Sequence, residues 1–195
     1  MKMKRMGLFL LAIAALALLL SATCLAQTPT GDNSFYFVTY YSNNVAGAPD
    51  AMLRFINDGE FGSNMTANIY VFDDSQELQA CGSCEITPDG ILSEDVKTEL
   101  TNNPLTGRIP TRGVIKVIGN AFTPAGAAEI APLRGWATHI QRATPTSGAY
   151  VTTEAPLADS NIGNELEVLP NLCYYAQLLG SGQGTITCTP EDHDF

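Results

Sequence analysis

Short runs of apolar residues, separated by turn-forming residues, dominate the chain after residue 33 and predict β-strands. Residues 35–41 (FYFVTYY) are aromatic and β-branched, which is typical strand composition. Residues 50–57 alternate, with Ala51, Leu53 and Phe55 on one face, so this segment predicts a strand with one buried face. The FYFVTYY strand is a candidate sheet edge, although an ordinary core strand is the commoner interpretation of such a segment.

The stretch from residue 65 to residue 90 contains the most information. Residues 65–72 are almost continuously apolar and predict a strand that is buried on both faces or lies in the middle of a sandwich. An acidic turn follows, then a Cys-Gly-Ser-Cys corner at residues 81–84 and a Pro-Asp-Gly turn at residues 88–90. Further strands are predicted at residues 113–118, 133–141, 148–154 and 184–188.

Two helical segments are expected. At residues 93–100, Ser93 is a plausible N-cap, and Glu94 and Asp95 follow in the first turn, where carboxylates complement exposed amides. A longer helix is predicted over about residues 160–179, and Pro170 within it should cause a kink or divide it into two successive helices. Its apolar stripe at three-and-four spacing comprises Ile162, Leu166, Leu169, Cys173 and Ala176.

This order of elements predicts a mainly β fold. Several short strands separated by turns favour an antiparallel β-sandwich, Ig-like or jelly-roll-like, with the C-terminal helical segment packed on it. No repeat at solenoid or propeller period and no low-complexity linker divides the chain. We therefore expect residues 27–195 to form a single domain.

Residues 1–26 have the features of a secretory signal peptide. A basic start is followed by an apolar run over residues 7–20 and by small residues suited to cleavage before Gln27. The apolar run is short for a membrane-spanning helix, which needs about 20 residues. Cys24 leaves a lipoprotein alternative, in which the protein would stay at the cell envelope. The expected location is secreted, periplasmic or at the cell surface, with no membrane span after cleavage.

The charge of the chain limits its partners. The full chain has a formal net charge of −10, and cleavage removes three of the ten basic residues and none of the twenty acidic ones, which leaves −13. Such a chain lacks the electrostatic attraction that drives nucleic-acid binding. Anionic membrane surfaces are disfavoured for the same reason. A protein partner or self-assembly remains compatible with this charge.

Four of the five cysteines follow the signal segment: Cys81, Cys84, Cys173 and Cys188. In an exported chain, four cysteines favour two disulfides, with three possible connectivities. A crossed pattern is favoured, because it would tie the corner to the C-terminal segment through loops near a hundred residues long. Redox catalysis by the CxxC is disfavoured because the motif does not start a helix. A zinc site is disfavoured because the other two cysteines are far apart in sequence.

The densest acidic patch comprises Asp73, Asp74 and Glu77. Carboxylates on a loop between strands can bind calcium through oxygen ligands, which makes these residues a weak calcium site candidate. The chain has no DxDxDG pattern, and a solvated acidic turn is the commoner interpretation. Calcium is the only cofactor considered.

Catalytic signals are few. His139 is expected as a half-exposed strand residue rather than a catalytic base, and the lone Trp136 is expected in the core. There is no GxSxG motif, and the glycine-rich residues 180–184 are not followed by a helix, so they do not form a phosphate-binding loop. No catalytic residue is assigned.

Several segments together resemble a group of uncharacterised exported bacterial proteins: APDAMLRFIN, YVFDDSQELQACGSCEITPDGI, NPLTGRIPTRGVIKVI, LRGWATHIQ and GSGQGTITC. The resemblance covers most of the chain after the signal segment. It implies a secreted, disulfide-containing, β-rich single domain, and it implies no activity, cofactor or catalytic residue.

Two functions are therefore considered. The favoured hypothesis is a disulfide-stabilised, non-catalytic structural or binding module of the cell envelope or extracellular space. The alternative is a secreted hydrolase that uses acidic residues such as Asp73, Asp74 and Glu77, with or without calcium. A concave site with converging carboxylates would favour the enzyme.

Overall fold

The computed structural model describes residues 35–101, 108–122, 128–144 and 148–179, together with Ile186 and Cys188. All of these residues belong to one compact unit, residues 33–195. The predicted signal segment, residues 189–195 and most of the predicted strand at residues 184–188 lie outside the described part of the chain.

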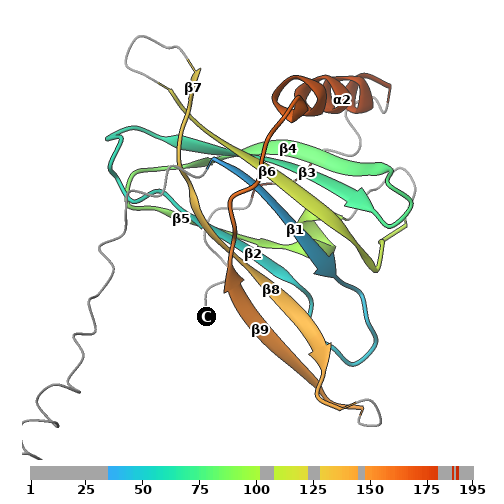
Figure 1. The fold of residues 1–195 in the computed structure, drawn as a ribbon. Helices are drawn as coiled ribbons and strands as arrows, with labels where there is room; N and C mark the ends of the chain where they lie inside the picture. Colours follow the sequence, from blue (N-terminus) through green and yellow to red (C-terminus); the bar gives the residue numbers. More distant parts are fainter. Residues whose placement is uncertain are drawn as a thin grey trace, which may run out of the picture. The chain divides into compact units, whose positions relative to one another are not determined.

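Two antiparallel sheets form the fold, which is a β-sandwich (Figure 1). Sheet A has the order β1 (Tyr36–Ser42), β6 (Arg112–Phe122), β3 (Met65–Asp73) and β4 (Leu78–Ile86), and β7 (Ala128–Ile130) also pairs with β6. Sheet B has the order β5 (Ile91–Asp95), β2 (Met52–Ile56), β8 (Arg134–Arg142) and β9 (Tyr150–Pro156). The mainly β, antiparallel fold predicted from the sequence is confirmed.

The main core lies between the two sheets. Because side chains alternate along a strand, each strand sends every second residue inward. In β2 the buried residues are Leu53 and Phe55, as the alternation predicted. The inward residues with at most 1% exposure that belong to strands include Leu53, Phe55, Met65, Ala67, Ile69, Val71, Cys84, Ile115 and Val117.

Sheet A is also covered on its outer face. Helix α2 (Glu165–Leu179) packs there, over β4, β3 and β6 (Figure 1). Leu169 of α2 is fully buried against the outward-facing Tyr36, Tyr70 and Ile118. This second cluster explains why β3 also carries apolar residues, Tyr70 and Phe72, on its outward face. Strand β1 is an outer strand of sheet A, yet Phe37 and Tyr41 on it are buried in the main core.

The structure corrects several local predictions. The Cys-Gly-Ser-Cys segment is not a corner but the middle of β4, which pairs with β3 from Leu78 to Ile86. Ser93 is not an N-cap, because it and Glu94 are buried in β5, a strand that pairs with β2. The cap is Asp95, whose Oδ1 accepts hydrogen bonds from the backbone amides of Lys97 and Thr98 at the start of the short π-helical turn η1 (Val96–Leu100).

The C-terminal helix also differs from the prediction. It begins at Glu165 rather than near residue 160, and it continues through Pro170 as one helix, so the predicted division into two helices is wrong and the predicted kink stays a prediction. Trp136 is not in the core: it is only half-buried and lies on the face of β8 opposite to the buried Gly135 and Ala137. Within the described residues, no helix is long and apolar enough to cross a membrane.

Candidate functional site

Strand β4 carries two disulfides on its opposite faces. Cys81 and Cys84 are three residues apart, and an odd spacing in a strand directs the two side chains to opposite sides of the sheet. Cys81 faces outward and is bonded to Cys173 of α2, with an S–S distance of 2.03 Å. Cys84 faces the main core and is bonded to Cys188, with an S–S distance of 2.11 Å. This is one of the two crossed connectivities.

The two bonds tie the C-terminal part of the chain to both faces of one strand. They span sequence separations of 92 and 104 residues. Ile186 is also bonded to β4, because its backbone amide donates to the Cys81 carbonyl over 3.2 Å. Gly82 makes this approach possible, since a Cβ atom there would lie 2.4 Å from the Ile186 side chain.

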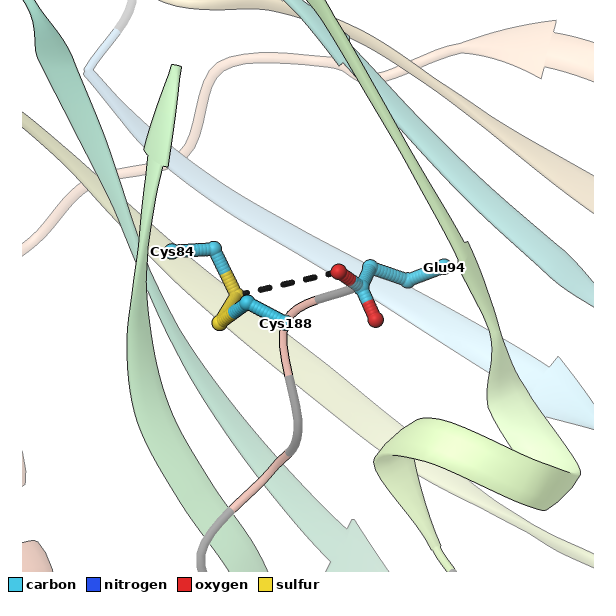
Figure 2. Close-up of side chains that lie close together, drawn as sticks. All are labelled: Cys84, Glu94 and Cys188. Carbon is cyan, nitrogen blue, oxygen red and sulfur yellow. Dashed lines mark hydrogen bonds between the residues drawn. A yellow bond between two sulfur atoms is a disulfide. The ribbon is translucent and has the colours of Figure 1, made fainter. Parts of the chain in front are cut away.

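A buried carboxyl group lies beside the inner disulfide. Glu94 of β5 pairs with Leu53 of β2, so its side chain shares the inward face with that fully buried leucine. Figure 2 shows the Glu94 carboxyl directed at the sulfurs of Cys84 and Cys188, with Oε1 3.8 Å from Cys84 Sγ. Glu94 has no solvent exposure. A disulfide sulfur has no proton, so a hydrogen bond here requires a protonated Glu94 as the donor.

The environment of Glu94 keeps the acid protonated. Burial, together with the charge of the nearby Glu99 carboxylate and a hydrogen bond with it, raises the pKa of Glu94 to about 8. Glu99 is held by the backbone amide of Asp95, which donates to Glu99 Oε2 over 2.5 Å. Within the described residues, Glu94 Oε2 receives no hydrogen bond. An ionised Glu94 would therefore face another carboxylate without a donor, whereas the neutral acid can act as a donor itself.

Among the described residues, Cys84, Glu94 and Cys188 form the group whose ligand atoms lie close enough to one another to bind one metal ion. With the sulfurs bonded to each other, the thiolates that a soft metal needs are absent. Sequence reasoning missed Glu94 because it placed this residue in a helical first turn. Glu94 lies two residues from the apolar Leu92 and two from the apolar Val96, and in a strand this spacing predicts that all three share the inward face.

The acidic turn between β3 and β4 uses its carboxylates in other ways. Asp73 is buried, and its Oδ1 accepts the backbone amides of Ser75 and Glu77, at 2.9 and 3.0 Å. Its Oδ2 accepts a hydrogen bond from Gln79. Asp73 therefore stabilises the turn in the way an Asx motif does.

Asp74 is exposed and forms an ion pair with Arg112, with a distance of 2.9 Å between Arg112 Nε and Asp74 Oδ2. The hydrogen bond from this guanidinium lowers the pKa of Asp74. Glu77 is exposed at the turn. Among the described residues, Asp73, Asp74 and Glu77 are not grouped within the span of one metal ion. Calcium binding at these residues remains a prediction.

A groove of about 480 Å³ lies between α2 and the outer face of sheet A. Its polar floor comes from the sheet: Asn68 donates to Asn120 Oδ1 over 2.7 Å, and the Ser83 hydroxyl donates to Asn68 Oδ1 over 2.6 Å. Its wall comes from α2 and includes Leu166 and Tyr174. None of the residues that line the groove is charged.

A second hollow, of about 390 Å³, lies where β1 meets β8 and β9. The His139 ring stacks on Tyr40, with ring centroids 4.2 Å apart, and burial lowers the pKa of His139. Within the described residues, its Nδ1 has no hydrogen-bond partner. The histidine is half-buried on a strand, as predicted, and the neighbouring residues Val38, Val114 and Leu157 are apolar.

No protein-family model matches the chain, and no curated protein matches it. Among solved structures, the chain is similar to the crystal structure of Thermotoga maritima 1070, with 13% sequence identity and a TM-score of 0.43. The match covers 67% of this chain and 97% of that chain. A likeness at this level carries no argument about function.

Proposed function

We propose that this protein is an exported, disulfide-stabilised, non-catalytic binding module that takes a neutral, polyhydroxylated ligand, such as a segment of a glycan, in the groove between α2 and sheet A. The chemistry of the groove lining carries the proposal. The chain has a formal net charge of −10, yet no residue that lines the groove is charged. An ionic ligand would therefore find no ion-pair partner there and would gain little binding energy from its charge.

The lining suits a ligand with many hydroxyl groups. Amide side chains offer both donors and acceptors, and Asn120 and Gln177 bring such groups to two sides of the groove, while Asn68 donates to the Ile118 carbonyl and to Asn120 Oδ1. Tyr174 adds an aromatic ring that is 60% exposed, against which the apolar face of a sugar ring can pack. The volume lies in the usual range for small-ligand sites, about 300–1,000 Å³.

The disulfide of Cys81 supports the binding hypothesis. It links the floor strand β4 to Cys173 on the wall helix, and both elements line the groove. A covalent link between the two sides keeps the groove formed in the absence of ligand, which lowers the entropic cost of binding. The acidic residues proposed for a hydrolase, Asp73 and Asp74, contribute to the β3–β4 turn and do not line the groove.

The test is titration calorimetry with neutral oligosaccharides of three to six units (cello-, malto- and chito-oligosaccharides) and with an oligogalacturonate as the charged comparison. We expect at least one neutral series to bind, and the Tyr174→Ala variant to bind it at least tenfold more weakly. The Leu172→Ala variant is the control, because this residue is exposed on the same helix but does not line the groove, whereas the Tyr175 ring contacts that of Tyr174.

Three outcomes would contradict the proposal. Absence of binding across the neutral series would remove the ligand class. An equal loss of affinity in the Tyr174 and Leu172 variants would exclude the groove as the site. Shortening of the oligosaccharides during incubation, followed by mass spectrometry, would favour the hydrolase instead.

A further inference from the structure

The two disulfides of this protein differ in their surroundings. Cys84–Cys188 has the Glu94 carboxyl 3.8 Å from one of its sulfurs. Among the described residues, no carboxyl group is clustered in this way with Cys81 and Cys173. A fully buried glutamate is unusual in an apolar core, and folding alone gives no reason for it. Its position at one disulfide and not at the other suggests a chemical role at that bond.

The burial of Cys84 creates the need for a proton. Exchange of a disulfide with a thiol releases one of its sulfurs as a thiolate. Cys84 has no solvent exposure, whereas Cys188 is half-buried and therefore closer to solvent. A thiol that arrives from solvent would attack Cys188 Sγ, and Cys84 would then leave as an anion inside the apolar core. Burial in apolar surroundings raises the pKa of a thiol, and a more basic thiolate is a poorer leaving group, so exchange is slow unless a proton is supplied at Cys84.

We propose that Cys84–Cys188 is a thiol-exchangeable disulfide, in which Glu94 donates its proton to the Cys84 sulfur when a thiol attacks Cys188. The attacking thiolate forms a new S–S bond to Cys188 Sγ, the Cys84–Cys188 bond breaks, and Cys84 Sγ takes the electron pair together with the Glu94 proton. A second thiolate of the reagent then attacks the mixed disulfide and releases Cys188 as a thiolate. Glu94 regains a proton from solvent. In the reverse direction, Glu94 accepts the Cys84 proton as the disulfide closes.

The acidity of Glu94 suits this exchange. Its pKa is about 8, and a thiol in apolar surroundings has a pKa above the free value of about 8.5, so transfer of the proton from Glu94 to the departing Cys84 sulfur is favourable. Glu99 of η1 is the titratable group that acts on Glu94, and both its charge and its hydrogen bond with Glu94 disfavour the ionised form. On β2 the residue paired with Glu94 is the apolar Leu53, and the disulfide on β4 does not titrate. The partner class is a small dithiol or a thiol oxidoreductase.

The experiment follows the reduction of the folded, oxidised protein by dithiothreitol. Samples are alkylated with iodoacetamide at intervals, and peptide mass analysis gives the opening rate of each disulfide. The measured quantity is the rate for Cys84–Cys188 divided by the rate for Cys81–Cys173 in the same molecule. This ratio cancels the ionisation of the reagent, because both bonds meet the same thiolate.

In the wild type we expect the ratio to fall as the pH rises from 6 to 9, because Glu94 loses its proton over that range. The Glu94→Gln variant should lower the ratio at least tenfold at pH 6 and leave it independent of pH. The Glu60→Gln variant, which changes an exposed glutamate, should behave as the wild type. A ratio that Glu94→Gln does not change would overturn the proposal. It would also be overturned if both bonds opened together in every variant, since reduction would then follow global unfolding.

Discussion

Replacing Glu94 by glutamine should change the pH dependence of stability in a way that can be calculated. The pKa of Glu94 is raised from an ordinary value of 4.5 to about 8. Between these values, the folded protein holds a proton that the unfolded chain releases. The free energy of unfolding therefore falls as the pH rises, by about 1.4 kcal/mol per pH unit for one such group. Below the lower value the loss is absent, and above the higher value it is complete.

Across the interval from 4.5 to about 8, the loss amounts to roughly 4–5 kcal/mol. This is a large part of the roughly 5–15 kcal/mol that stabilises a typical domain. Glu94→Gln removes the titration but keeps the size of the side chain and a hydrogen-bond donor. We expect the variant to match the wild type at pH 5 to within about 1 kcal/mol, and to be more stable by about 3–4 kcal/mol at pH 7.5.

The assay is guanidinium chloride unfolding at pH 5, 6, 7 and 8 with the disulfides intact, followed by far-ultraviolet circular dichroism. Measurements from pH 5 upward avoid the titration of exposed pairs such as Asp74 with Arg112, since the pKa of Asp74 is lowered. Glu60→Gln is the control and should follow the wild-type curve. Parallel pH curves for the wild type and Glu94→Gln would refute the argument, because Glu94 would then titrate alike in both states.

Three further predictions concern packing, register and calcium. Leu169→Ala should cost about 2–5 kcal/mol in chemical unfolding, because Leu169 is fully buried beneath α2, whereas Leu172→Ala on the exposed side of the helix should cost less than about 1 kcal/mol. Gly113→Ala should lower the melting temperature clearly, since the new Cβ would lie 1.9 Å from the Phe72 carbonyl oxygen on the paired strand β3. Gly148→Ala is the control: no atom lies within 4 Å of its new Cβ, so the melting temperature should not change. Thermal melting in calcium and then in a chelator should show a shift below about one degree, because the buried carboxylate of the β3–β4 turn already accepts hydrogen bonds; a rise of several degrees would establish a calcium site.

The strands were the most predictable part of the fold. Leu53 and Phe55 alternate with less buried residues, and a period of two depends only on the geometry of an extended chain. The continuous apolar run of β3 also predicted burial on two sides, although it could not reveal that α2 provides the second cover. These predictions succeeded because each pattern depends on neighbours in the same strand.

The local errors have a common cause. Gly82 and Ser83 resemble turn residues, yet they belong to a strand because they pair with β3. The glycine also leaves space for the Ile186 side chain. Ser93 and Glu94 resemble the start of a helix, but pairing with β2 holds them extended. In each case a partner distant in sequence overrides a local preference.

The sequence by itself determined the β-rich composition, the acidic charge, the four cysteines available for bonding and the faces of the regular strands, because these properties reside in single residues or in their spacing. Only the tertiary structure decided which cysteines pair, where the uncharged groove lies and which carboxylate is buried. The CxxC spacing directs the two sulfurs to opposite faces of β4. Only the folded chain determines their partners: Cys173 of α2 on the outer face, and Cys188 beside Glu94 on the inner face. Contacts between segments about a hundred residues apart depend on how the sheets stack, and no local pattern encodes that.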